Sequence, residues 1–362
     1  MNNFVKWDSE FKKQNLFAFN YNKNGLLWLK VRAISRSKQI NNFVSQNNIN
    51  LSSSKVSEQF AELFCYLESN EDTSLQLLDS FLKVHSNNWY VSLGVDENKL
   101  KQDLYLVHNY EWGGDQNNSL DKYLVSRYVK VISDFNILQS RQNEIAHNAW
   151  NYVQTSWYNN WTSYLIESLF KRHSKVVSAV GEIKSVDFFI GDYPIDLKVT
   201  YLPNQFMDGK LKNKLGKKEL SWLKDKARNF KISVDSNLPE SQQLYELSEK
   251  ISDSGHIEIL TELSETRRQI IYEVQNSKDE LMKWLYENQG EMRFGAENRL
   301  FMILIDSTDM TQSWKMKRAF NLISPKVNQY LDDFNSSSLK QIDFTFKGNS
   351  YSSLADIIFV VK

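Results

Sequence analysis

The segment VDFFIGDYPIDLKVTYL (186–202) decides the fold. Two short runs of β-branched and aromatic residues flank Gly-Asp-Tyr-Pro, a pattern that predicts two strands joined by a tight turn. Because side chains alternate between the two faces of a strand, Asp196, Lys198 and Thr200 share one face of the second strand. Asp187 points away from the apolar residues beside it on the first strand. Charged groups inside such apolar strands are costly unless something pairs with them.

The segments around this hairpin alternate between helical and extended patterns. The Trp-rich stretch 136–173 has apolar residues at helical spacing and predicts one long helix. VVSAVGEI (176–183) predicts a short strand before the hairpin, and RLFMILID (299–306) a buried strand well after it. Two further strands, QIDFTFK and ADIIFVV, are predicted near the end of the chain. The sequence therefore predicts an α/β fold with a limited sheet.

The rest of the chain is expected to be mostly helical. Only 12 Gly and 4 Pro occur in 362 residues, and long stretches contain neither. Residues 1–135 are predicted to form a helical N-terminal region. Residues 136–362 would contain the sheet, with a helical insertion at about 205–298.

Composition limits the classes of protein that fit. Lys plus Arg equals Asp plus Glu, at 44 each, so the whole-chain charge predicts no partner, although local basic surfaces remain open. The single Cys65 excludes an internal disulfide and a cysteine-rich zinc site, and its apolar surroundings predict a buried thiol. Without a signal peptide or an apolar run of membrane-spanning length, a soluble cytoplasmic protein that does not enter a membrane is expected.

The hairpin carboxylates are suited to a hard divalent cation. Magnesium takes one or two protein carboxylates and completes its octahedral shell with water and substrate phosphate. Asp187 and Asp196, on adjacent strands, could provide those ligands. Lys198 could orient or deprotonate an attacking water, or stabilise charge that develops on a phosphate.

Asp187, followed across a tight hairpin by Asp196-Leu197-Lys198 and preceded by a long helix, resembles the PD-(D/E)XK nuclease superfamily of restriction endonucleases and related enzymes. The resemblance covers roughly 160–202. It implies a restriction-endonuclease-like core, a mixed sheet flanked by helices, with Asp187 as the metal-binding acid of the hairpin. Asp196 and Lys198 would be the acid and the lysine of the D-x-K element.

Two features depart from the superfamily pattern. Val186 stands before Asp187 where the pattern has proline, and the long region between Asp196 and the strand at 299 requires an insertion. Many members also place an acid on the preceding helix. Glu167 is the candidate here, with a solvated surface glutamate as the open alternative, and Glu182 is a second candidate.

The segment 208–231 is locally basic, with nine Lys and Arg residues against three acids. If it is helical from about 217, one face carries Lys217, Lys224, Arg228 and Lys231. Such a face could follow the phosphates of a duplex, because the DNA backbone is a dense line of negative charge. An ordinary solvated lysine-rich helix is the alternative interpretation.

The resemblance implies a magnesium-dependent endonuclease that hydrolyses double-stranded DNA, most simply a type II restriction enzyme. A homodimer is expected from it, because both strands of a duplex must be cut. Two alternatives stay open. One is another nuclease of the same core, acting in phage defence or DNA repair. The other is a non-catalytic helical DNA-binding or assembly protein, since an acid-x-lysine triplet is common and an exposed hairpin can carry charges on its wet face.

Overall fold

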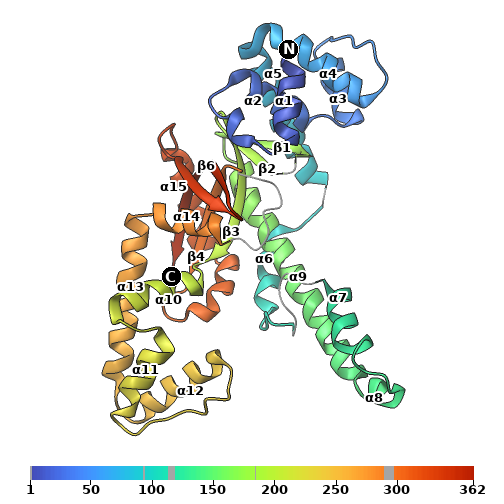
Figure 1. The fold of residues 1–362 in the computed structure, drawn as a ribbon. Helices are drawn as coiled ribbons and strands as arrows, with labels where there is room; N and C mark the ends of the chain where they lie inside the picture. Colours follow the sequence, from blue (N-terminus) through green and yellow to red (C-terminus); the bar gives the residue numbers. More distant parts are fainter. Residues whose placement is uncertain (1, 93, 113–118, 184, 289–296) are drawn as a thin grey trace.

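The computed structural model describes residues 2–92, 94–112, 119–183, 185–288 and 297–362 (Figure 1). Its centre is a mixed sheet of six strands: β1 (Val176–Ile183), β2 (Val186–Ile190), β3 (Tyr193–Tyr201), β4 (Arg299–Ile305), β5 (Lys340–Phe346) and β6 (Asn349–Val361). Their order across the sheet is β1-β2-β3-β4-β6-β5. β2 is antiparallel to both β1 and β3, the strands β3, β4 and β6 run parallel, and β5 is antiparallel to β6. The predicted α/β class and the predicted strands are confirmed.

The hairpin turn and the central strand follow directly from their residues. Gly191 adopts a φ of 57° between β2 and β3, a left-handed conformation that glycine reaches without Cβ strain. Every residue of β4 is buried, as expected of an apolar strand between two parallel neighbours. β4, which pairs with both β3 and β6, is therefore the buried central strand of this part of the sheet.

Helices cover both faces of the sheet. The helices before it are α1 (Asn3–Lys12), α2 (Lys23–Ala33), α3 (Ser37–Gln46), α4 (Val56–Leu67), α5 (Glu71–Ser92), α6 (Glu97–Asp103), α7 (Leu120–Leu124), α8 (Phe135–Ser140) and α9 (Gln142–Lys171). Between β3 and β4 come α10 (Asn204–Leu215), α11 (Glu219–Arg228), α12 (Glu240–Asp253), α13 (Ile257–Asn276) and α14 (Asp279–Glu287). After β4 come a 3-10 segment (Met310–Arg318) and α15 (Phe320–Asp333).

One face of the sheet is covered by α9 and α15. The rings of Phe170 on α9 and Phe188 on β2 stack at a centroid distance of 5.3 Å. Ile323 and Val327 of α15 join the same buried cluster. This packing fixes the C-terminal part of α9 beside β2 and β3.

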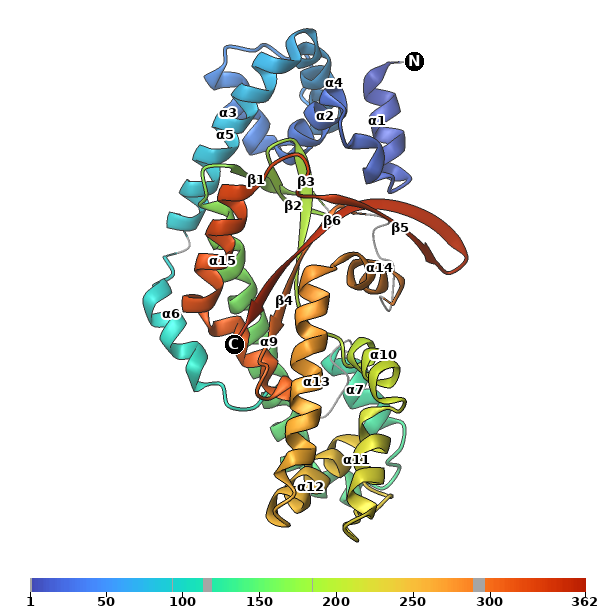
Figure 2. The same cartoon turned by 90° about the vertical axis from the view of Figure 1, so that its left-hand side faces the viewer.

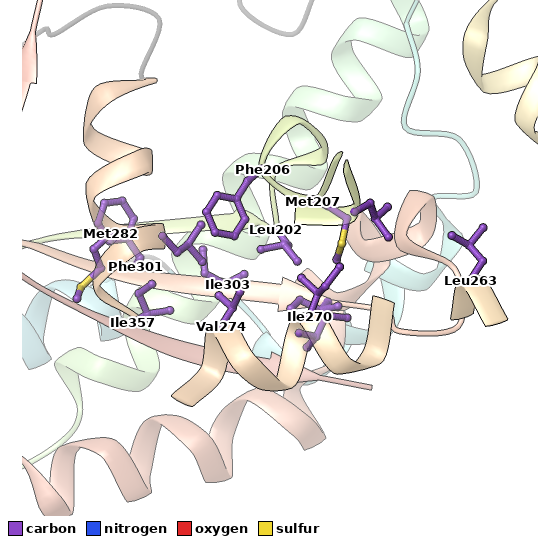
Figure 3. Packing of buried hydrophobic residues seen from close by; sticks show 14 of the residues in the cluster. Leu202, Phe206, Met207, Leu263, Ile270, Val274, Met282, Phe301, Ile303 and Ile357 are labelled. Carbon is purple, nitrogen blue, oxygen red and sulfur yellow. The ribbon is translucent and has the colours of Figure 1, made fainter. Parts of the chain in front are cut away.

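The opposite face is covered by the helices inserted between β3 and β4. Figure 3 shows Phe301 and Ile303 of β4 packed among side chains from α10, α13 and α14, including Phe206, Ile270 and Met282. Burial of these side chains holds the inserted helices on the sheet. Each Å² of apolar surface removed from water contributes roughly 25 cal/mol of stability.

The N-terminal helices α1–α5 lie at one end of the sheet and pack on Val177 and Phe189 of β1 and β2. From the other end, α7–α9 and α10–α13 extend as two separate helical arms (Figure 1, and Figure 2 from the side). The single helix expected over 136–173 is interrupted: α8 ends and α9 begins around Arg141, whose φ and ψ of −88° and 1° lie outside the helical range.

The expected burial of the only cysteine is wrong, because Cys65 is exposed on α4. None of the helices that the structure describes is both long and apolar enough to cross a membrane.

Candidate active site at the β2–β3 fork

The strands β2 and β3 separate where the two hairpin carboxylates lie. β3 pairs with β2 only over Tyr193–Ile195 and then with β4 over Asp196–Tyr201. Phe188 is opposite Ile195, so Asp187 and Asp196 are the next residues in register, at the point where the ladder opens. There the Oδ2 atom of Asp187 accepts a hydrogen bond from the Leu197 backbone N–H at 2.8 Å. The Asp187 carboxylate thus accepts the Leu197 backbone N–H, which has no partner on β2.

The two carboxylates are electrostatically coupled to Glu167 of α9. Burial, and to a smaller extent the charges of Glu167 and Asp196, together raise the pKa of Asp187 to about 7. Burial also raises the pKa of Asp196, where Arg299 and Lys198 act in the opposite direction and Glu167 adds to the rise. We call Glu167, Asp187 and Asp196 the carboxylate cluster. The structure therefore places Asp187 and Asp196 opposite each other, with Glu167 close enough for its charge to act on both.

Each member of the cluster has its own partner. Glu167 forms an ion pair with Lys171, one helical turn along α9, at 2.9 Å. The Nε of Arg299 lies 3.3 Å from a carboxylate oxygen of Asp196. Within the described residues, no three or more His, Cys, Asp or Glu side chains lie together as a ready-made metal site. The donors are nevertheless all carboxylate oxygens, the ligand type that magnesium prefers.

Lys198 is the exposed member of the site. It is two residues beyond Asp196 on β3 and on the same face, and its charge lowers the pKa of Asp196. The side chain of Glu182, the second candidate for the additional acid, lies outside the described part of the chain.

Two residues of the site were not identified from the sequence. Arg299 is paired in register with Asp196 across β3 and β4, and its Nη2 binds Glu297 at 2.6 Å. Glu297 is almost fully buried, 1% exposed, and its pKa is raised by burial. The only sign of this in the sequence was a charged residue, Arg299, at the start of the apolar run RLFMILI. Its meaning depends on the register of β4 against β3, which the sequence does not specify.

The expected single basic helix face is wrong. Gly216, with a φ of 75°, ends α10, and α11 starts only at Glu219, so Lys217 precedes the helix. Lys231 follows its end at Arg228, with a φ of 60°. Because only Lys224 and Arg228 lie within α11, the helical spacing that would place all four residues on one face does not apply to them.

The turn between α10 and α11 creates a different basic surface. A hollow of about 450 Å³ is lined by Lys212, Gly216, Lys217, Lys218, Ser221, Lys224, Asp225 and Arg228. We call it the basic hollow. It includes three of the four predicted residues and omits Lys231. Lys217 and Arg228 both pair with Asp225, and Lys224 donates to Gln243. The lining thus holds five cations and a single carboxylate.

Comparison of the chain with protein-family models, with curated proteins and with solved structures finds no match.

Proposed function

We propose that this protein is a magnesium-dependent DNA endonuclease of the PD-(D/E)XK type. The observation that carries the proposal is the meeting of Asp187 and Asp196 at the opening of the β2–β3 ladder, with Lys198 on the same face. The supporting order of elements is a long helix, three antiparallel strands, and a fourth strand parallel to the third.

The carboxylate cluster favours a functional site over an incidental one. Gathering acids where burial and the neighbouring charges raise the pKa of Asp187 to about 7 destabilises the folded protein at neutral pH. An amphipathic hairpin with charges only on a wet face would avoid that cost. Strongly perturbed acids beside a specific charge partner are typical of functional sites.

Asp187 and Asp196, assisted by Glu167, would hold the Mg²⁺ ion. When bound, magnesium activates water and neutralises charge at the scissile phosphate. Lys198 has an exposed ammonium group that can orient the water or stabilise the charge on the phosphate oxygens. Arg299, held by Glu297, keeps a positive charge beside Asp196 and so favours its ionised, metal-binding form.

Double-stranded DNA is the proposed substrate. The basic hollow concentrates positive charge on the inserted helices, which begin three residues after β3. Phosphate contacts of this kind position a protein on DNA without reading its sequence. A restriction-type enzyme acting as a homodimer is the proposed subtype, and a defence or repair nuclease is the second candidate.

Incubation of the protein with unmethylated phage DNA and Mg²⁺, followed by sequencing of the fragment ends, tests the proposal. Ends that share a sequence identify a restriction enzyme, whereas cleavage without a common sequence favours a repair or defence nuclease. DNA binding that is equal with and without Mg²⁺, together with intact DNA, identifies a non-catalytic binding protein and refutes the proposal.

Neutralising the basic hollow should weaken binding to every duplex. The triple variant Lys217→Gln, Lys224→Gln and Arg228→Gln removes three cations that can contact phosphates. Each lost contact is expected to reduce the slope of log affinity against log salt by about 1. Fluorescence anisotropy across a salt series measures this slope on duplexes of unrelated sequence.

Lys231→Gln is the matched control, because Lys231 follows the same helix but does not line the basic hollow. It should leave the salt slope nearly unchanged. A triple variant with the affinity and slope of the unmodified protein would assign DNA binding to another surface. A changed sequence preference at unchanged overall affinity would instead place α11 against bases.

A further inference from the structure

A cavity lies between the N-terminal helices and the start of β2. It has a volume of about 480 Å³, within the range of small-ligand sites, and a mostly apolar lining. Phe4 and Phe11 of α1, Arg32 of α2, Phe60 of α4 and Ser185 contribute to its wall. We call it the aromatic cavity.

The rings of this wall are held in place by their neighbours. Phe4 and Phe60 meet edge to face at a centroid distance of 5.0 Å. Trp28, fully buried, supports Phe11 at 5.2 Å and Phe60 at 5.2 Å. The aromatic surfaces are therefore fixed before any ligand arrives, which reduces the conformational entropy lost on binding.

Arg32 places the hydrogen-bond donors of its guanidinium group beside these rings in the cavity wall. Its guanidinium carbon lies 5.6 Å from the ring centroid of Phe11 and 5.5 Å from that of Phe60. Within the described part of the chain, no carboxylate or other acceptor pairs with this guanidinium. Asp8, in the same wall, is paired with Lys12 at 2.6 Å. The cavity thus offers aromatic rings and several N–H donors to one ligand.

We propose that the aromatic cavity binds a single nucleobase of the DNA, turned out of the duplex. A base is flat and apolar on its faces, and its edge has nitrogen and oxygen acceptors. Proteins bind such extruded bases by stacking on aromatic side chains and by hydrogen bonds to the edge. A simple anion would make no use of three phenyl rings, and a simple hydrocarbon would make no use of Arg32.

The position of the cavity supports a base rather than an unrelated small molecule. Ser185, in its wall, lies in the turn just before β2, two residues ahead of Asp187. Burial raises the pKa of Glu297, and a hydrogen bond from Ser185 partly offsets that rise; Glu297 in turn binds Arg299 beside Asp196. The cavity wall is therefore linked to Asp196 of the carboxylate cluster through Glu297 and Arg299. The inference rests on the proposed function, since it assigns a binding role to DNA at that same site.

The first experiment compares two duplexes that differ in one extrahelical base. The full-length Asp196→Asn variant is titrated with a fully paired duplex and with the same duplex carrying a single bulged adenine. A bulged base has already lost its stacking and pairing, so it enters a pocket at lower cost. The bulged duplex is expected to bind about ten-fold more tightly, the scale of one base stacked on aromatic side chains.

Two substitutions in the wall should remove this preference. Phe11→Leu keeps an apolar side chain but removes the flat ring, and Arg32→Met keeps the stem but removes the donors. Both are expected to bind the two duplexes with nearly equal affinity and to unfold near the temperature of the parent. Lys6→Met is the control, because Lys6 lies over the ring of Trp7 at 4.4 Å and outside the cavity wall. A preference that is absent in the parent, or that survives both cavity substitutions, overturns the inference.

A second measurement separates this inference from the proposed function. Saturation-transfer NMR of the unmodified protein with deoxyadenosine monophosphate should show binding that is lost in Phe11→Leu, and deoxyribose 5-phosphate should show none. Nucleotide binding without any DNA cleavage would support the cavity and contradict the nuclease. DNA cleavage without nucleotide binding or bulge preference would contradict the cavity alone. Equal binding of deoxyribose 5-phosphate would identify an anion site and overturn the inference.

Discussion

Asp196→Asn is expected to lower the rate of DNA cleavage by about 10³-fold while the protein stays folded. Asparagine keeps the volume of aspartate and one oxygen, but it removes the negative charge that a magnesium ligand needs. The fold should tolerate the change because Arg299 retains Glu297 as an ionic partner. Single-turnover cleavage of a duplex in Mg²⁺ gives the rate, and thermal unfolding checks the fold.

Lys198→Ala should produce a loss of the same order for a different reason. Lys198 is exposed, so its removal leaves the apolar side of β3 intact and takes away only the charge near the phosphate. Lys340→Ala is the matched control, since Lys340 is an exposed lysine on β5 at the far edge of the same sheet. Calcium should support binding without cutting, because its looser coordination positions water less well. Undiminished turnover in either site variant would exclude the β2–β3 fork as the catalytic centre.

The strands and the candidate site were predictable because their determinants are local. Alternation along 186–202 places Asp196 and Lys198 on one face whatever surrounds the hairpin. The Gly-Asp turn fixes which residues of β2 and β3 are opposite each other, and so it brings Asp187 next to Asp196. Glu167 joins them because Phe170, three residues along α9, stacks on Phe188, one residue after Asp187.

The features that escaped prediction depend on contacts between distant segments or on backbone breaks. Arg299 meets Asp196 only because β4 pairs with β3 in parallel, in a register that more than ninety intervening residues leave unspecified. The basic residues of 208–231 looked like one helix face, whereas Gly216 ends one helix and starts a turn. The wall of the aromatic cavity is formed by α1, α2, α4 and Ser185, and no periodic pattern in the sequence predicts that these separate segments meet.

Asp187→Asn is expected to stabilise the metal-free protein at neutral and alkaline pH. The folded-state pKa of Asp187 is raised from 3.8 to about 7, mainly by burial. When the pKa of a carboxyl group is higher in the folded than in the unfolded protein, the folded state binds the proton more tightly. The protein is then most stable below the pKa of the unfolded state, and it loses stability as the pH rises to the pKa of the folded state. The unmodified protein should therefore lose stability between about pH 4 and pH 7, relative to an uncharged side chain. Each unit of pKa corresponds to about 1.4 kcal/mol, so the gain from asparagine above pH 7 has an upper limit of about 4.5 kcal/mol.

Urea unfolding of both proteins in EDTA, from pH 4 to pH 8, measures this difference. The gain should be small at pH 4, grow up to about pH 7 and then level off, while the Asp187→Asn protein fails to cut DNA at any pH. The amide oxygen of asparagine can still accept from Leu197 N–H, so the hairpin contact itself is retained. Asp192→Asn, which removes an exposed carboxylate from the turn of the same hairpin, should change stability little. A gain of equal size at pH 4 and pH 8 would trace the effect to packing rather than to charge. A loss of stability at pH 8 would show that the fold depends on the ionised carboxylate, contrary to the expected cost of burying that charge beside Glu167 and Asp196.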